Sequence, residues 1–164
     1  ELAGLTVGFG GSMTLKTIGI ADMLEKDKVF WHWGEKRADT FTNAANADAY
    51  LSSANAISED GEILNIDGTG NRLAGQVFGK KTVYIISGTN KICPDFTSAV
   101  ERAKNVAAPM NSQRFPAEPP CKKGGKCYDC RSADRICRAM LVLMAPMMDM
   151  EKVEVVLIDE ELGF

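Results

Sequence analysis

The 164-residue chain lacks most of the features that point directly to a function. No apolar run reaches the roughly 18 residues needed to cross a membrane, and a net charge of −3 supplies no positive field for nucleic acid or a membrane surface. Nucleotide P-loop and G-x-S-x-G hydrolase motifs are missing. The single histidine, His32, has no catalytic partner in the sequence, so we expect a packed or surface side chain. These absences leave a globular protein with neither a nucleic-acid nor a membrane partner.

The remaining pattern predicts one α/β domain over residues 1–164. Segments with strand character alternate with segments of helical periodicity. We expect strands at 5–9, 29–33, 49–54, 62–66, 82–87 and 153–158, and helices at 14–26, 70–78, 95–108 and 135–144. The segment 37–48 is a short helix or a loop, a turn separates the strands 49–54 and 62–66, and the last strand reads as fully buried. Such alternation is typical of a mostly parallel sheet flanked by helices.

Three polar, glycine-bearing stretches follow predicted strands: GFGGS, the EDG–IDGTGN region and SGTNK. Ligands of parallel sheets bind at the carboxyl ends of strands, so we expect these stretches to share one anion-binding site. Arg72 and Lys91 are natural partners for a carboxylate or phosphate. The alternative for GFGGS is a tight turn in which Ser12 or Thr14 caps the following helix. The predicted ligand-binding residues are Gly10, Gly11, Ser12, Asn55, Asp67, Gly68, Thr69, Gly70, Arg72, Asn90 and Lys91.

Four cysteines fall within residues 121–137 in the pattern C-x5-C-x2-C-x6-C: Cys121, Cys127, Cys130 and Cys137. Four thiols this close together can converge on zinc or on an iron–sulfur cluster. The spacing matches neither the double C-x2-C zinc ribbon nor the commonest ferredoxin run. Two disulfides or four free thiols are the alternatives.

Several phrases of the chain, in this order, resemble the lactate-utilisation (LUD) domain family: GFGGSMT, SANAISEDGEILNIDGTGNR, SGTNKI, ERAKNVAAPMNSQR and the closing LGF. The resemblance covers essentially the whole chain. It implies a bacterial, cytoplasmic protein associated with L-lactate oxidation alongside iron–sulfur partner subunits. It also implies a fold like that of ribose-phosphate isomerases and CoA transferases. Family members begin some tens of residues earlier, so we expect the natural N-terminal segment to be missing here.

Two enzyme groups of that fold carry phrases similar to residues 54–69. Methylthioribose-phosphate isomerases have a catalytic aspartate where this chain has Asn55, and an amide cannot shuttle the proton that isomerisation requires. CoA transferases have a Ser-Glu-Asn-Gly phrase whose glutamate is the nucleophile, and Glu59 in Ser-Glu-Asp-Gly resembles it. The same tetrapeptide is also an ordinary turn.

The leading hypothesis is therefore a LUD-domain component of bacterial L-lactate or organic-acid utilisation that binds an anionic small molecule. One alternative is a non-catalytic assembly module that docks an iron–sulfur redox subunit. The other is an acyl or CoA transferase that uses Glu59 as its catalytic residue.

Overall fold

The computed structural model describes residues 2–24, 28–31 and 39–164, so His32 lies outside the described residues. The chain divides into two compact units. Unit 1 consists of Glu1–Ser53, Asn71–Thr89 and Ala145–Gly163, and unit 2 of Ala54–Gly70, Asn90–Met144 and Phe164. None of the described helices is long and apolar enough to span a bilayer.

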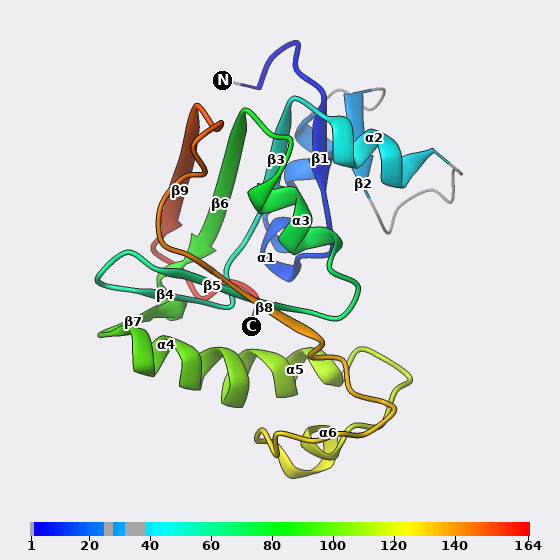
Figure 1. The fold of residues 1–164 in the computed structure, drawn as a ribbon, viewed down its shortest axis with the longest axis vertical. Coiled ribbons are helices and arrows are strands. Elements are labelled where there is room, and N and C mark those ends of the chain that lie inside the picture. Colours follow the sequence, from blue (N-terminus) through cyan, green and yellow to red (C-terminus); the bar gives the residue numbers. More distant parts are fainter. Residues whose placement is uncertain (1, 25–27, 32–38) are drawn as a thin grey trace. The chain divides into compact units, whose positions relative to one another are not determined.

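Unit 1 contains a five-stranded sheet in the order β2-β1-β3-β6-β9, with every neighbouring pair parallel (Figure 1). This confirms the predicted mixed α/β fold with a mostly parallel sheet flanked by helices. The strands are β1 (Val7–Phe9), β2 (Val29–Trp31), β3 (Ala49–Ser52), β6 (Thr82–Gly88) and β9 (Lys152–Ile158).

Helices cover both faces of this sheet around β1 and β3. They are α1 (Met13–Thr17), the 3-10 helix η1 (Ile20–Met23), α2 (Thr40–Asn46) and α3 (Asn71–Val77). Side chains alternate along a strand, so Phe9 and Leu51 pack with Leu15 of α1 on one face. On the other face, a Cβ atom on Gly8 would lie 2.4 Å from the carbonyl oxygen of Ala44 in α2, so only glycine permits this approach.

Unit 2 contains a mixed four-stranded sheet in the order β7-β4-β5-β8. Its strands are β4 (Ala56–Ser58), β5 (Ile63–Asp67), β7 (Ile92–Cys93) and β8 (Ala139–Leu143). Strand β5 is antiparallel to β4 and β8, whereas β4 and β7 are parallel. Its helical elements are α4 (Phe96–Arg102), the π-helical turn η4 (Ala103–Ala107), α5 (Ala108–Ser112) and α6 (Pro120–Gly124), and the 3-10 turn η3 (Thr89–Lys91) precedes β7. Ala99 and Ala103 pack on Ala56, Leu64 and Cys93 of the sheet.

The helix expected at 14–26 ends early. Helix α1 stops at Thr17, and Gly19, with a φ of 66°, separates it from η1.

Two further predicted elements are wrong. The helix expected at 135–144 is replaced by β8, in which Leu141 and Met140 pair with Asn65 and Ile66 of β5. Its run of Met, Leu and Val suits either structure, and the neighbouring β5 edge favours the strand. The strands expected at 49–54 and 62–66 do not flank one turn, because β3 belongs to the sheet of unit 1 and β5 folds back on β4.

The helix expected over 95–108 begins where the sequence predicts. Asp95 caps it by accepting a hydrogen bond from the backbone N–H of Ser98 at 2.7 Å. However, the helical run continues through Pro109 to Ser112. The wider turn η4, which ends at Ala107, allows the helical run to include Pro109, a residue that cannot donate a backbone hydrogen bond.

The last predicted strand exists as β9, but it is not fully buried. Val155, Val156 and Leu157 are 42%, 38% and 48% exposed. Strand β9 lies at the end of the strand order and pairs with β6 alone among the described strands. An edge position explains why a continuous apolar run remains accessible here.

Candidate functional site

The parallel sheet of unit 1 has a topological switch point between β1 and β3. The chain passes from β1 to β2 on one side and then returns to β3 on the other. Ligand sites of open parallel sheets lie outside the carboxyl ends of the strands at such a point. In this chain, Gly10, Gly11 and Ser12 follow β1, and Ser53 follows β3.

The structure brings Arg72 to this point. A Cβ atom built on Gly10 would lie 2.8 Å from Nδ2 of Asn71 and 3.5 Å from Cβ of Arg72. The start of α3 therefore packs directly on the loop after β1. The Nδ2 atom of Asn71 is buried, with no hydrogen-bond partner among the described residues. The first two residues of α3, one with a buried amide donor and one with a cationic side chain, thus lie against the loop after β1.

Ser12 acts as a helix cap, as expected if GFGGS is a tight turn before a helix. Its Oγ accepts a hydrogen bond from the backbone N–H of Leu15 at 3.2 Å. Helix α1 has only five residues, so its dipole contributes little to anion binding. Arg72 carries a positive charge on a side chain whose Cβ atom packs near Gly10.

A buried polar network fixes the strand ends beneath this loop. Gln76 donates from Nε2 to Oγ of Ser52 at 2.7 Å, and Ser53 donates from Oγ to Oγ1 of Thr14 at 3.1 Å. Thr14 in turn donates to the carbonyl oxygen of Leu162 at 3.2 Å. All four side chains are buried. A fully hydrogen-bonded network of this kind rigidifies its surroundings, so it preorganises the loop.

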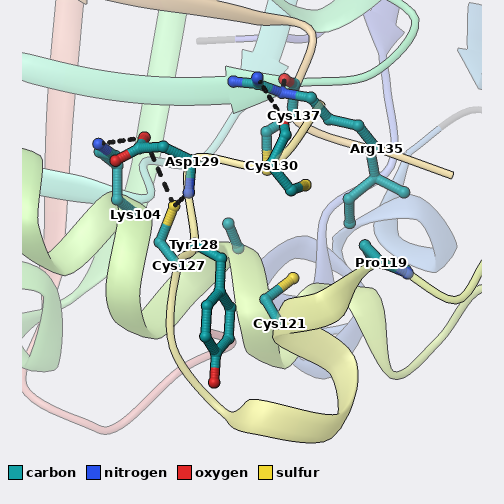
Figure 2. A pocket seen from close by; sticks show the side chains of 11 residues that line it. Lys104, Pro119, Cys121, Cys127, Tyr128, Asp129, Cys130, Arg135 and Cys137 are labelled. Carbon is teal, nitrogen blue, oxygen red and sulfur yellow. Dashed lines mark hydrogen bonds and ion pairs between the residues drawn. The ribbon is translucent and has the colours of Figure 1, made fainter. Parts of the chain in front are cut away.

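In unit 2, the four clustered cysteines line one pocket, together with Lys104, Pro119, Tyr128, Asp129 and Arg135. Figure 2 shows Cys121 at helix α6 and the other three cysteines on the loops that follow. All four are free thiols, as is Cys93, which lies in the core of the unit 2 sheet. No three His, Cys, Asp or Glu side chains of the described residues already surround one coordination point.

The loops that carry these cysteines are held by hydrogen bonds to their backbone. Arg135 donates from Nη1 to the carbonyl oxygen of Cys130 at 2.8 Å and from Nε to that of Cys137 (Figure 2). The backbone N–H of Asp129 donates to Sγ of Cys127 at 3.4 Å, and Asp129 adopts a left-handed φ of 44°. Lys104 forms an ion pair with Asp129 at 2.6 Å. This arrangement orients the C-x2-C pair towards the pocket.

Burial and neighbouring thiols raise the pKa of Cys137 to about 11. Burial is the larger cause, followed by the charges of Cys121 and Cys127, while Arg135 acts in the opposite direction. The geometric evidence that the four thiols are neighbours is that all of them line the same pocket.

The predicted glycine-rich turn at 67–70 supports the cysteine loop. Asp67 accepts hydrogen bonds through Oδ1 from the backbone N–H groups of Thr69 and Gly70, at 3.0 and 3.2 Å. The carbonyl oxygen of Asp67 accepts from the N–H of Arg138 at 2.9 Å. A Cβ atom on Gly68 would lie 2.7 Å from the carbonyl oxygen of Ile136. These contacts bracket Cys137, the residue between Ile136 and Arg138.

Comparison with known proteins identifies the family. The family model described as LUD domain matches residues 2–158. The chain belongs to the LUD domain family. A solved structure of a DUF162 family protein from Deinococcus radiodurans is 14% identical to this LUD domain, with a TM-score of 0.44 over 94% of this chain and 88% of that chain. No curated protein sequence matched the LUD chain.

The other predicted ligand residues of the LUD domain lie in unit 2 and have structural contacts there. Asn55 accepts through Oδ1 from the backbone N–H of Ile66 at 2.7 Å, inside the sheet. The buried ammonium of Lys91 donates to the carbonyl oxygen of Ala54 at 3.0 Å. The carbonyl oxygen of Asn90 accepts from Nε of Arg102 at 3.1 Å. The predicted ligand residues thus fall into two groups, one in each unit.

Glu59 lies on the exposed turn that joins β4 to β5. The N–H of Gly61 donates to the carbonyl oxygen of Ser58 at 3.0 Å, and Gly61 has a φ of 105°. These are the properties of an ordinary tight turn. The geometry of the LUD domain gives the acyl-transferase alternative no support.

Sequence reasoning missed several residues that organise both regions: Asn71, Arg102, Lys104 and Asp129. Arg102 is half-buried and also donates from Nη1 to the carbonyl oxygen of Asn55 at 2.5 Å. Burial lowers the pKa of this guanidinium. Arg135 differs from them, because the sequence places this cation between Cys130 and Cys137, where it can offset thiolate charge. The missed residues meet neighbours from distant parts of the chain, as Lys104 meets Asp129 and Arg102 meets Asn55, and local sequence does not reveal such contacts.

Proposed function

We propose that this LUD domain binds an anionic small molecule at the switch point of unit 1, as a component of bacterial organic-acid utilisation. The observation that supports this proposal most is the packing of Asn71 and Arg72 against Gly10. It combines a cation, a buried amide donor and a glycine loop at the place where parallel sheets bind ligands. The loop lies on a rigid polar network, so little ordering would be needed on binding.

The ligand class follows from the chemistry of Arg72. A guanidinium group binds a carboxylate or phosphate with two parallel hydrogen bonds, which gives both charge and geometry. Asn71 can donate to a further oxygen, such as the hydroxyl of a 2-hydroxy acid. L-lactate has both groups, and it is the substrate that the family resemblance names.

We assign ligand binding to this chain and the redox step to a partner. The side chains at the switch point, Ser12, Asn71 and Arg72, include no group that acts as a general base at neutral pH. Oxidation of an organic acid also needs an electron acceptor, which fits the iron–sulfur partner subunits that the family resemblance implies.

Calorimetric titration with L-lactate and, separately, with inorganic phosphate tests the proposal. We expect saturable binding to the wild type and at least a tenfold loss of affinity in Arg72→Ala. Lys16→Ala is the matched control, because it removes an exposed cation from the neighbouring helix α1. An equal loss in both variants would indicate general electrostatic attraction, and no binding of either anion would refute the proposal.

A second candidate function, docking of an iron–sulfur redox subunit, is favoured by strand β9. Parallel sheets are normally covered on both faces, yet Val155, Val156 and Leu157 remain exposed on successive positions. We expect Val156→Lys to weaken co-purification with a co-expressed iron–sulfur subunit without changing the melting temperature. Self-association of the chain alone, abolished by the same substitution, would instead assign β9 to a second copy.

A further inference from the structure

Residues 120–138 of unit 2 have a defined backbone without a hydrophobic core of their own. Cys121 is the only buried residue among them. Their regular structure is limited to the five residues of α6, which ends at Gly125 with a φ of 70°. Apolar burial is the main force that orders a chain, so this segment needs another source of order.

Hydrogen bonds in the segment are mostly at the surface. Arg135 bridges two backbone carbonyl groups, and Lys122 donates to the carbonyl oxygen of Phe115 and pairs with Glu118. Contacts of this kind exchange with water and add little net stability. They select one conformation of the loops, but they do not compensate for the entropy of fixing nineteen residues.

Small segments of this kind are usually fixed by disulfides or by a metal. The cysteines of the pocket are all free thiols. They line one pocket from α6 and from two successive loops. Structural metal centres join separate pieces of chain through ligands arranged in this way. Thiolates are soft ligands, which select zinc or iron–sulfur clusters over magnesium or calcium.

The surroundings of the pocket fit a bound thiolate centre. Lys104 and Arg135 line it and offset the negative charge that thiolates bring. The backbone N–H of Asp129 already donates to Sγ of Cys127, the type of hydrogen bond that supports metal-bound sulfur. On the other side, the turn at 67–70 fixes the backbone around Cys137 through Gly68 and Asp67.

We propose that Cys121, Cys127, Cys130 and Cys137 bind one thiophilic metal centre, and that this centre orders residues 120–138. Each thiol loses its proton on binding, and the four sulfurs are drawn from the lining of the pocket onto one coordination point. The metal therefore acts as a cross-link between α6, the C-x2-C loop and the segment before β8. All four cysteines belong to unit 2, whereas the residues of the proposed anion site belong to unit 1.

Metal analysis of the full chain, purified without oxygen, is the first arm of the test. We expect either one zinc ion per chain or iron with inorganic sulfide and visible absorption, and either result supports the proposal. Cys127→Ser should lose most of the metal, whereas Cys93→Ser, which removes a buried thiol outside the pocket, should retain it. A chain with no metal and four freely titrating thiols, or with a disulfide among them, would overturn the proposal.

Limited trypsin digestion is the second arm, because the segment contains several cleavage sites: Lys122, Lys123, Lys126, Arg131, Arg135 and Arg138. Removal of the metal should increase cleavage at these sites at least tenfold and leave the sites of unit 1 unchanged. Restoring the metal should restore protection in Cys93→Ser but not in Cys127→Ser. Equal cleavage rates with and without bound metal would refute the ordering role, even if a metal is present.

Discussion

The five-stranded sheet of unit 1 and residues 120–138 of unit 2 represent two ways of ordering a chain. In the sheet, Val7, Leu51 and Val83 are almost completely buried, and order follows from apolar packing. In residues 120–138 one side chain is buried, and the segment is arranged around four thiols. The comparison teaches that the proposed anion site lies on a scaffold ordered by apolar packing, whereas the proposed metal centre would itself order the residues around it.

The largest expected effect is in the sheet of unit 1. Leu51→Ala removes a fully buried side chain from the core formed with Phe9 and Leu15, and should lower the free energy of unfolding by about 2–5 kcal/mol. Urea denaturation followed by circular dichroism measures it. Tyr128→Ala, at a half-exposed position beside the cysteines, is the control and should change stability far less. Similar losses of unfolding free energy in the two variants would contradict the proposed difference between the two regions.

An intermediate effect is expected at Gly68. A methyl group there would lie 2.7 Å from the carbonyl oxygen of Ile136, so Gly68→Ala should push the backbone around Cys137 aside, at a cost of about 1–3 kcal/mol. Metal content per chain should fall in this variant while the sheet of unit 1 keeps its unfolding midpoint. Thr69→Ala, at the exposed next position, should retain the metal. Unchanged metal content in Gly68→Ala would contradict the supporting role of this turn.

The smallest effect concerns acid stability of unit 1. Hydrogen bonds from the side chain and backbone of Thr6 lower the pKa of Asp48 below its usual 3.8. Folding therefore favours the ionised carboxylate, and its contribution is present above the unfolded pKa and is lost as pH falls through the lowered value. Asp48→Asn keeps an acceptor for Thr6 but does not titrate. Thermal unfolding between pH 2 and pH 6 should show less acid sensitivity in the variant, and parallel profiles would be the contrary result.

The same comparison explains what the sequence could predict. The parallel sheet could be predicted because the alternation of strand-like and helix-like segments reflects which residues are buried. The bounds of β6 and β9 lie within one residue of the predicted ones. The segment 135–144 was assigned to a helix because its apolar run has no clear period, and only pairing with β5 decides for β8. The exposure of β9 depends on its place at the edge of the sheet, which local pattern does not contain.

Some of the predicted site residues lie together in the structure, and others do not. Gly10 and Arg72 were predicted to share a site, and the structure places them together because α3 begins against the loop after β1. Asn55 and Asp67 have the composition of a binding site, but their side chains bond to the backbone of unit 2. Residue types indicate which groups can bind a ligand. Whether a group is already engaged depends on the backbone atoms near it, which come from distant parts of the chain.

An amide chemical-shift titration of the full chain with L-lactate tests the central claim, ligand binding at the switch point, most directly. Unit 1 should respond and residues 120–138 should not. We expect saturable shifts for the backbone N–H groups of Gly10, Gly11, Ser12 and Arg72, and their loss in Arg72→Ala but not in Lys16→Ala. Saturable shifts confined to unit 2, or no saturable shift with either L-lactate or phosphate, would contradict the account.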